Sequence, residues 1–180
     1  MADEPVTIDM LLYKVLRSLD DSSRAIYRNV HIEGLQTVDM EDTWDRSRYQ
    51  TGLSLTLPDG GRLLEHAIRN LLANALQYGI NRQHINCACI CLRHALADEN
   101  RCLLIQVSDH GAGISLEHQK KIFQPFFRVP GIPRSRPASV GLGLALVESI
   151  ADYYGGSVEV QSQPGQGSTF CLKIPVEIHR

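Results

Sequence analysis

The sequence predicts an α/β fold in which a few helices cover one face of a single sheet. Helical and strand-like segments are interleaved along the 180 residues, and the last two strands are joined by a short turn that contains Gly and Pro, as in an antiparallel hairpin. The chain is 43% hydrophobic and 21% charged, close to the average for globular proteins. We therefore expect one domain over residues 1–180, built around one hydrophobic core.

Composition and charge exclude several classes of function. The 18 Lys and Arg against 20 Asp and Glu give a net charge of −2, which argues against a nucleic-acid protein held by bulk electrostatics. Apolar runs fall short of the roughly 20 residues of a membrane helix, and the acidic start does not resemble a signal peptide. We expect a soluble chain that contacts neither nucleic acid nor membrane.

The first third of the chain predicts a helix and two strands. Residues 6–24 carry apolar positions at helical spacing, residues 25–35 alternate as a strand, and residues 36–50 have no assignment. Leu53–Leu57 predicts a second strand, and Asp59 in the turn after it is a candidate helix cap. The apolar positions of the helix are Ile8, Leu11, Leu12, Val15, Leu16 and Leu19.

A long helix is predicted over Arg62–Tyr78, and Gly79 ends it. Its apolar residues recur in pairs four apart and fill a wide arc of the helix surface. Asn70 and Asn74, one turn apart, lie at the edge of that arc. The pairs are Leu63 and Leu64, Ala67 and Ile68, Leu71 and Leu72, and Ala75 and Leu76.

The second half of the chain predicts four strands and two helices around a loop rich in Pro and Arg. In chain order these are strands His84–Leu92 and Cys102–Val107, a helix near Leu116–Phe123, the loop Arg128–Ser139, a helix at Leu142–Tyr154, and strands Ser157–Gln161 and Thr169–Val176.

An acidic motif follows the apolar strand Leu103–Val107. Asp109 stands at the strand end, where a carboxylate can accept a hydrogen bond from an exocyclic amine. Gly111 and Gly113 beside it let a flat ring approach the backbone closely. The motif suits an adenine pocket, or else a plain Asp-Gly turn between a strand and a helix.

Asn70 and Asn74 present two carboxamides on one edge of the long helix. Such groups reach a hard cation and phosphate oxygens, and Mg²⁺ bound to a triphosphate is the natural partner, since this ion needs few protein oxygens. The alternative is a pair of solvated or capping asparagines.

A glycine motif, Gly141-Leu142-Gly143-Leu144, opens a predicted helix. Free N–H groups and the dipole at a helix start form a phosphate site. The motif is not a dinucleotide fingerprint, because Leu146 stands where the third glycine would be, and the chain has no Gly-Lys pair for a P-loop. The alternative is a flexible helix start.

Three aromatic residues precede the Pro- and Arg-rich loop. Phe123, Phe126 and Phe127 are followed by the cations Arg128, Arg134 and Arg136. Such a segment is a candidate lid over an anionic ligand, or else a solvated surface loop.

In order and spacing, these motifs resemble the catalytic domain of sensor histidine kinases, within the GHKL superfamily of ATP-binding proteins. The resemblance covers about residues 5–176 and implies the Bergerat fold, a two-layer sandwich of one mixed sheet under about three helices with an ATP lid. It rests on Asn70–Tyr78, Asp109–Gly113, Ile122–Arg128, Gly141–Leu144, Gly155-Gly156 and Gly165–Phe170.

The resemblance implies ATP and Mg²⁺ as cofactors. Asn74, with Asn70 beside it, is expected to hold the metal, and Asn70, Asn74 and Arg128 are the expected catalytic residues. Asp109 is expected to bind the adenine amine. The expected cofactor-binding residues are Asn70, Asn74, Tyr78, Asp109, Gly111, Gly113, Phe123, Arg128, Gly141, Leu142, Gly143, Leu144 and Thr169.

Three positions depart from the common pattern of the family: Gln77, His110 and Ser139. Gln77 stands where many kinases carry Lys or Arg, which removes one charge from the phosphate region. A further difference concerns the hydrolytic members of the superfamily, which carry a Glu where this chain has Asn70. An amide is a poor general base, so we expect a site that holds ATP for transfer rather than for hydrolysis.

The phosphate acceptor is expected on another domain. Such kinases phosphorylate a His usually followed by an acidic residue, and none of the seven His here is followed by one. We expect a His-containing dimerisation domain, absent from this chain, as the partner, and a response regulator indirectly. The chain is expected to be cytoplasmic, in an inner-membrane sensor when full length. The alternatives are a stand-alone GHKL regulator, such as an anti-sigma serine kinase, and a nucleotide-binding module without turnover.

Overall fold

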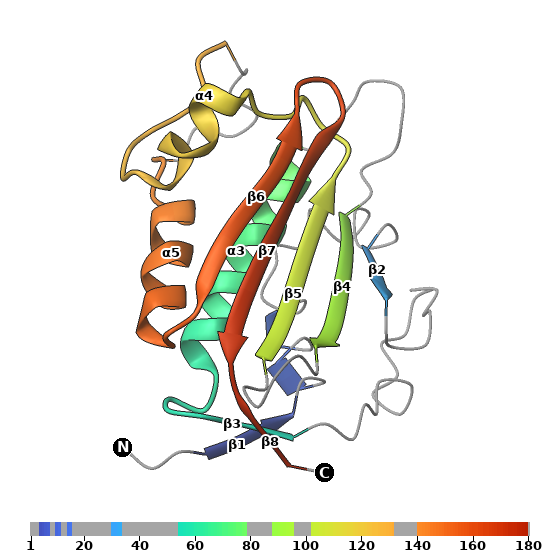
Figure 1. The fold of residues 1–180 in the computed structure, drawn as a ribbon, viewed down its shortest axis with the longest axis vertical. Coiled ribbons are helices and arrows are strands. Elements are labelled where there is room, and N and C mark those ends of the chain that lie inside the picture. Colours follow the sequence, from blue (N-terminus) through green and yellow to red (C-terminus); the bar gives the residue numbers. More distant parts are fainter. Residues whose placement is uncertain are drawn as a thin grey trace.

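The computed structural model describes residues 4–7, 10–11, 14–15, 30–33, 54–78, 88–95, 102–131 and 140–179. Within them, helices pack on one face of a sheet, as the sequence predicts (Figure 1). The elements are β1 (Glu4–Thr7), β2 (Val30–Glu33), β3 (Ser54–Leu57), α3 (Arg62–Tyr78), β4 (Ala88–Ala95), β5 (Cys102–Asp109), α4 (Leu116–Gln119), the 3₁₀ turn η3 (Lys121–Phe123), α5 (Gly143–Tyr153), β6 (Ser157–Gln163), β7 (Gly167–Pro175) and β8 (Glu177–His179).

The main sheet is mixed, which confirms the expected fold class. Its strand order is β2-β4-β5-β7-β6, with β2 parallel to β4 and the other neighbours antiparallel. In the β5–β7 ladder, Asp109 lies opposite Ser168 and Val107 lies opposite Phe170. Because side chains alternate between the two faces of a strand, these four residues lie on the same face, toward the helices.

A second, three-stranded sheet of order β1-β3-β8 was not predicted. Its first strand occupies residues 4–7, so the expected helix over residues 6–24 cannot begin at residue 6. Residues 10–11 and 14–15 are helical, with Leu11 and Val15 buried, and the remainder of that helix lies outside the described residues. The error has a physical source: β1 is fixed by pairing with β3, fifty residues away, and not by local periodicity.

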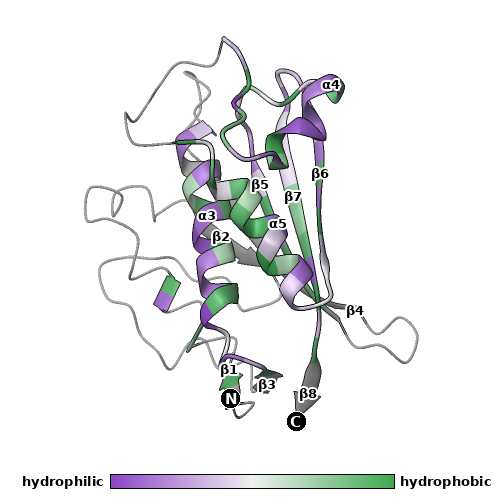
Figure 2. Ribbon diagram, turned by 90° about the vertical axis from the view of Figure 1, so that its left-hand side faces the viewer, coloured by the Kyte–Doolittle hydropathy of each residue, from purple (hydrophilic) through white to green (hydrophobic). Residues whose placement is uncertain are grey.

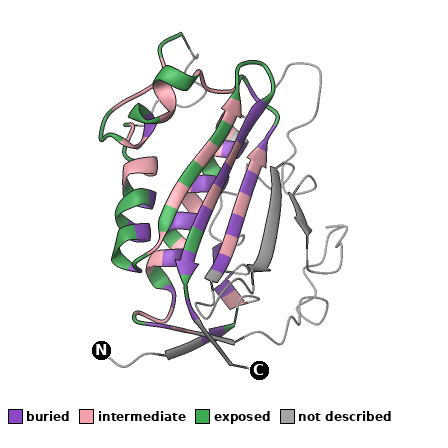
Figure 3. Cartoon of the chain, in the orientation of Figure 1, coloured by how far each residue is buried: buried purple, intermediate pink, exposed green. Residues whose placement is uncertain are grey.

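Helix α3 has the predicted bounds and carries much of the core. Figure 2 shows hydrophobic and hydrophilic residues on different sides of α3, which runs beside α5 over the sheet. Its core-facing residues are Leu64, Ala67, Ile68, Leu71, Leu72 and Ala75, all buried. In Figure 3 the buried residues gather on α3, β5 and β7, where the two layers meet. Because the apolar face of α3 packs into the core, its polar edge faces away from the core.

The remaining elements lie close to their predicted places. β3, β5, α5, β6 and β7 differ from prediction by one or two residues at their ends, and β4 is shifted toward its C-terminus, the expected residues 84–87 lying outside the described part. The single helix expected near residues 116–123 is instead α4 and η3, separated at Lys120. Helix α4 contributes no buried residue, whereas Ile122 in η3 is buried, so the hydrophobic anchoring of this segment lies at its end.

The start of α3 is joined to the end of α5 by Asp59 and Tyr154. The Asp59 carboxylate accepts the N–H of Leu63 at 2.7 Å, which confirms it as a cap, and it also accepts the hydroxyl of Tyr154 at 2.5 Å. The Tyr154 oxygen in turn accepts the N–H of Leu64 at 3.3 Å. Burial and the bond to Asp59 raise the pKa of Tyr154, so its hydroxyl stays protonated as a donor.

We predict that Tyr154→Phe lowers the free energy of unfolding by about 2 kcal/mol, because a hydrogen bond to a carboxylate is lost and the Leu64 N–H loses its acceptor. Urea denaturation followed by circular dichroism measures the change. Tyr153→Phe is the matched control, since Tyr153 is exposed. Equal stabilities of the two variants would contradict this role for the Tyr154 hydroxyl.

Candidate functional site

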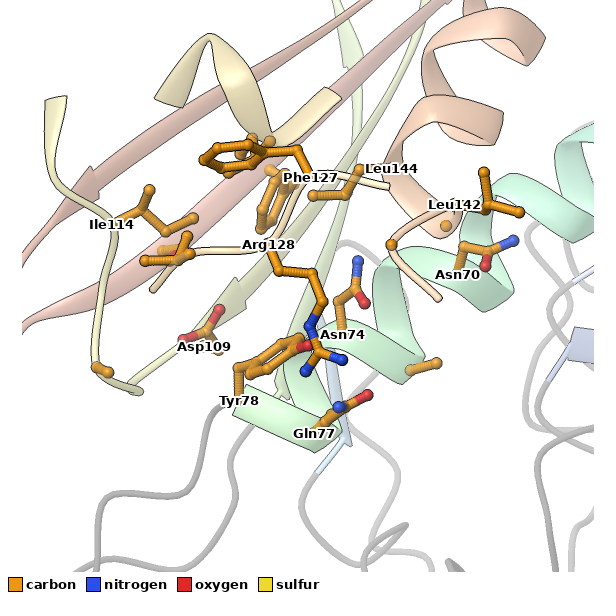
Figure 4. A pocket seen from close by; sticks show the side chains of 18 of the residues that line it. Asn70, Asn74, Gln77, Tyr78, Asp109, Ile114, Phe127, Arg128, Leu142 and Leu144 are labelled. Atoms are coloured by element: carbon orange, nitrogen blue, oxygen red, sulfur yellow. The ribbon is translucent and has the colours of Figure 1, made fainter. Parts of the chain in front are cut away.

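A cavity of about 400 Å³ opens between the C-terminal half of α3, the end of β5 and the start of α5 (Figure 4). Ten of the thirteen residues expected to bind a cofactor line it. They are Asn70, Asn74, Tyr78, Asp109, Gly113, Arg128, Gly141, Leu142, Gly143 and Leu144. Segments that are up to 74 residues apart in sequence, from Asn70 to Leu144, therefore share one hollow.

Three of the expected residues, Gly111, Phe123 and Thr169, are not among the residues that line the cavity. Gly111 is buried against the end of α3, where a Cβ would stand 2.0 Å from the Tyr78 carbonyl oxygen. Phe123 packs against the hydrophobic core. Thr169 lies on the opposite face of β7, where its hydroxyl is 2.8 Å from that of Ser108.

Asp109 is a buried carboxylate at one end of the cavity, with only 7% of its surface exposed. Its Oδ1 accepts the N–H of Gly111 at 2.8 Å. The N–H of Ser168, across the ladder, also bonds to it. In Figure 4 the Asp109 carboxylate lies beside Tyr78. Two fixed donors thus orient the carboxylate, and it remains among the cavity-lining residues.

Burial raises the pKa of the Asp109 carboxyl above its usual value. The backbone N–H groups of Gly111 and Ser168 and the nearby His110 oppose the increase, without cancelling it. The cause is desolvation, which disfavours the charged form of a carboxylate held away from water. Such a group is a strong hydrogen-bond acceptor for a ligand that enters the cavity.

The polar edge of α3 supplies the two asparagines, and Figure 4 shows them at different depths. Asn74 lies in the middle of the cavity, facing the Arg128 side chain, which extends toward Tyr78 and Gln77. Asn70 lies at the far end, beside Leu142. Its Nδ2 donates to the carbonyl of His66 at 2.8 Å, so its Oδ1 is directed toward the Gly143 end.

The aromatic segment and the glycine segment are joined by their backbones. The N–H of Phe126 donates to the carbonyl of Gly141 at 2.9 Å. Gly141 has a φ of 80°, and a Cβ there would stand 2.9 Å from the carbonyl oxygen of Phe127, so a larger residue would force the two segments apart. Phe126 itself adopts a φ of 66° and is 68% exposed, unlike the core residue that its neighbours suggest.

The first turn of α5 faces the cavity through Gly143 and Leu144. The N-cap, Leu142, provides no side-chain hydrogen bond. The first intrahelical bond of this turn is from Leu146 to Leu142, at 2.9 Å. The N–H groups that precede Leu146 in the helix therefore have no acceptor within it, and the positive end of the helix dipole points the same way.

Several lining residues were not predicted. Alternation along β7 could have indicated Ser168 and Phe170, which point inward from either side of Thr169. The rest carry no sequence signal, because small or apolar residues reach a cavity only through the way segments pack. These lining residues are Ile114, Val129 and Val140, whereas Ala73, Ala112, Ile122, Phe127 and Gln77 also line the cavity but belong to motifs that the sequence had singled out.

The expected lid falls mainly outside the described part, including Arg134 and Arg136. Within the described residues, groups of three or more His, Cys, Asp or Glu that could hold a metal are absent. The described helices likewise include none with both the length and the apolar character that crossing a membrane requires.

Residues 59–178 match the family described as "Histidine kinase-, DNA gyrase B-, and HSP90-like ATPase". The sensor-like histidine kinase SenX3 of Mycolicibacterium smegmatis is 35% identical over 132 residues, which cover 70% of this chain and 33% of that protein. The sensor histidine kinase AtsR of Burkholderia thailandensis is 32% identical over 179 residues, which cover 97% of this chain and 26% of that protein. The chain thus spans about a third or less of these relatives.

The structure of the mycobacterial sensor histidine kinase MprB has the same fold. It superposes with a TM-score of 0.64 at 20% sequence identity, covering 99% of this chain and all of that one. At this level of identity the likeness concerns the arrangement of the elements. It agrees with the α/β architecture described above.

We predict that the stability difference between the wild type and Asp109→Asn depends on pH. Because burial raises the pKa of Asp109, the folded protein binds more protons than the unfolded chain between the two pKa values, so its stability falls as pH rises through that interval. The variant lacks this ionisation. The wild type should therefore gain stability relative to the variant as the pH is lowered toward 3.8, the usual pKa of the carboxyl group, in paired urea titrations. A constant difference, or the opposite slope, would contradict the burial argument.

Proposed function

The chain belongs to the family of histidine kinase-, DNA gyrase B- and HSP90-like ATPases, and on that basis we propose that it is the ATP-binding catalytic domain of a two-component sensor histidine kinase. It would transfer the γ-phosphoryl group of ATP to a histidine on a separate dimerisation domain. The observation that carries the proposal is the shared cavity in which Asn74, Asp109 and the Gly141–Leu144 segment meet.

The adenine would occupy the Asp109 end of the cavity. The carboxylate is buried and oriented by two backbone donors, so it can accept the exocyclic amine of adenine without reorganising. Apolar side chains, including Ile114, Ile122 and Phe170, would pack against the ring. Tyr78 lies next to Asp109 and would border the same ring (Figure 4).

The triphosphate would extend toward the start of α5. Free N–H groups at Gly143 and Leu144 and the helix dipole favour an anion there. Arg128 extends into the middle of the cavity and would add a positive charge (Figure 4). These groups would orient the phosphates and balance their charge during transfer.

Asn74, with Asn70 at the far end, would hold Mg²⁺. The donor set fits this ion, which prefers oxygen ligands and keeps several waters, so that one or two protein oxygens suffice beside the phosphates. The Nδ2 of Asn70 is bonded to His66, which leaves its Oδ1 on the Gly143 side. When bound, the ion would neutralise charge that develops on the phosphates.

Asn70 also bears on the choice between transfer and hydrolysis. A carboxamide cannot take a proton from water, and its nitrogen is already engaged with the carbonyl of His66. The cavity would therefore hold ATP with little hydrolysis until an acceptor nucleophile approaches.

The acceptor and the signal partners would lie in other segments. The relatives are sensor kinases about three times or more the length of the matched region. We infer a His-bearing helical dimerisation domain as the direct partner and a response regulator as the next one in the relay. In a full-length sensor of the inner membrane, this domain would lie in the cytoplasm.

We predict that Asp109→Asn lowers ATP affinity at least tenfold, because the amide cannot accept from the adenine amine and both backbone N–H donors as the carboxylate does. Isothermal titration calorimetry measures the affinity, with circular dichroism to check folding. Asp152→Asn, at an exposed position on α5, is the matched control. Wild-type affinity in a folded Asp109→Asn protein would refute adenine binding at this residue.

We predict that Asn74→Ala abolishes Mg²⁺-dependent phosphoryl transfer to a separately supplied His-bearing dimerisation domain, because the metal loses its central protein oxygen. Labelled ATP and an acid-labile phosphate on the acceptor provide the readout. Gln161→Ala, which removes an exposed amide on the opposite face of β6, should transfer at the wild-type rate.

Other outcomes of the same assay separate the alternatives. Acid-stable phosphate on a partner would favour a serine kinase regulator. Tight ATP binding without transfer to any acceptor would favour a nucleotide-binding module. Undiminished transfer by Asn74→Ala would remove this residue from the metal site.

A further inference from the structure

The segment between β5 and α4 forms one wall of the cavity without regular secondary structure. Its backbone polar groups therefore need partners elsewhere. The N–H of Ile114 donates to Oγ of Ser162 at 2.8 Å, and the carbonyl of Ile114 accepts Nε2 of Gln119 at 3.0 Å. The carbonyl of Ala112 accepts the N–H of Gly165 at 2.7 Å. The wall is thus held by α4 and by the β6–β7 hairpin.

Ser162 uses its full hydrogen-bonding capacity in this arrangement. Its hydroxyl donates to the carbonyl of Gly167 at 2.7 Å. A hydroxyl has one proton, so the 3.0 Å contact between Ser162 and Ser168 requires Ser168 to donate. Ser162 then accepts from both Ile114 and Ser168, two residues that line the cavity.

Gln119 completes the same connection from α4. Its Nε2 donates to the carbonyl of Ile114 and, at 2.8 Å, to the carbonyl of Ser162. Both protons of the amide are therefore used, and one side chain joins α4, the cavity wall and β6.

This chain of hydrogen bonds, from Gln119 and Ser162 through Ser168, ends at the Asp109 carboxylate. Ser168 is 6% exposed, lies opposite Asp109 in the ladder and donates its N–H to that carboxylate. Ser162 is thus one hydrogen bond from Ser168, whose backbone orients Asp109. Neither Ser162 nor Gln119 is among the residues lining the cavity, so any effect on a ligand must pass through Ser168 and Ile114.

We propose that Ser162 and Gln119 are positioning residues that hold Ile114 and Ser168 in register with Asp109, and so set how strongly the site prefers adenine to a purine that lacks the 6-amino group. This inference rests on the proposed function, because it assumes that the adenine lies at Asp109. The two residues act only through the geometry of that end of the cavity.

The test compares ATP with purine riboside 5′-triphosphate, which lacks the 6-amino group, by calorimetry on the full chain. Ser162→Ala should weaken ATP binding about tenfold and purine riboside triphosphate binding much less, so the preference shrinks. Ser162→Thr keeps the hydroxyl and should restore the preference. Ser149→Ala is the control, since the hydroxyl of Ser149 is exposed and bonds within α5, to Ala145.

If Ser162→Ala does not fold, Gln119→Ala tests the same inference, because it also removes a hydrogen bond to Ile114. This variant should likewise reduce the preference for ATP over purine riboside triphosphate. Folded variants that retain the wild-type preference for ATP would overturn the inference. Variants whose affinity falls equally for both nucleotides would also overturn it, because a purely structural role predicts that result. If the wild type fails to bind ATP, the proposed function fails, and this measurement is independent of the variants.

Discussion

The arrangement of the site depends on keeping one carboxylate away from water. A buried carboxylate is costly unless protein donors replace its hydration. Two backbone N–H groups offset part of this cost at Asp109, one from the turn that follows it and one from Ser168 on the neighbouring strand. The turn must fold back to supply the first donor, and this brings Gly111 against the last carbonyl of α3. The need to solvate the buried Asp109 carboxylate thus links the end of β5, the β6–β7 hairpin and the end of α3.

The other end of the cavity lies between two antiparallel helices, α3 and α5. The polar C-terminal half of α3 faces the glycine-rich start of α5 across the cavity. At the opposite ends of the two helices, Asp59 is hydrogen-bonded to Tyr154. Under the proposed function, the choice between hydrolysis and transfer would depend on the side chain that α3 presents to the phosphates. In this chain that side chain would be Asn70, whose Nδ2 is already bonded to the carbonyl of His66 in the same helix.

Local patterns predicted the elements whose structure is decided locally. Helix α3 was predicted in full because seventeen residues repeat one apolar arc, and Asp59 and Asp109 stand in recognisable turn and strand-end positions. The β1-β3-β8 sheet was missed because its three strands come from distant parts of the chain. Thr169 was assigned to the cavity, whereas the strand register turns Ser168 inward instead. Ser162 gave no signal, since its partners become neighbours only when the hairpin folds onto the wall.

The small sheet has a mechanical consequence. β1 and β8 both pair with β3, at the end of the domain opposite the Asp109 end of β5 (Figure 1). Tension applied through β1 and β8 would act first on the hydrogen bonds of the short β1–β3 and β3–β8 ladders. The longer β5–β7 ladder, which carries Asp109, would bear the force only after those ladders had separated. Strain transmitted through these strands would therefore be absorbed at the end of the domain away from Asp109.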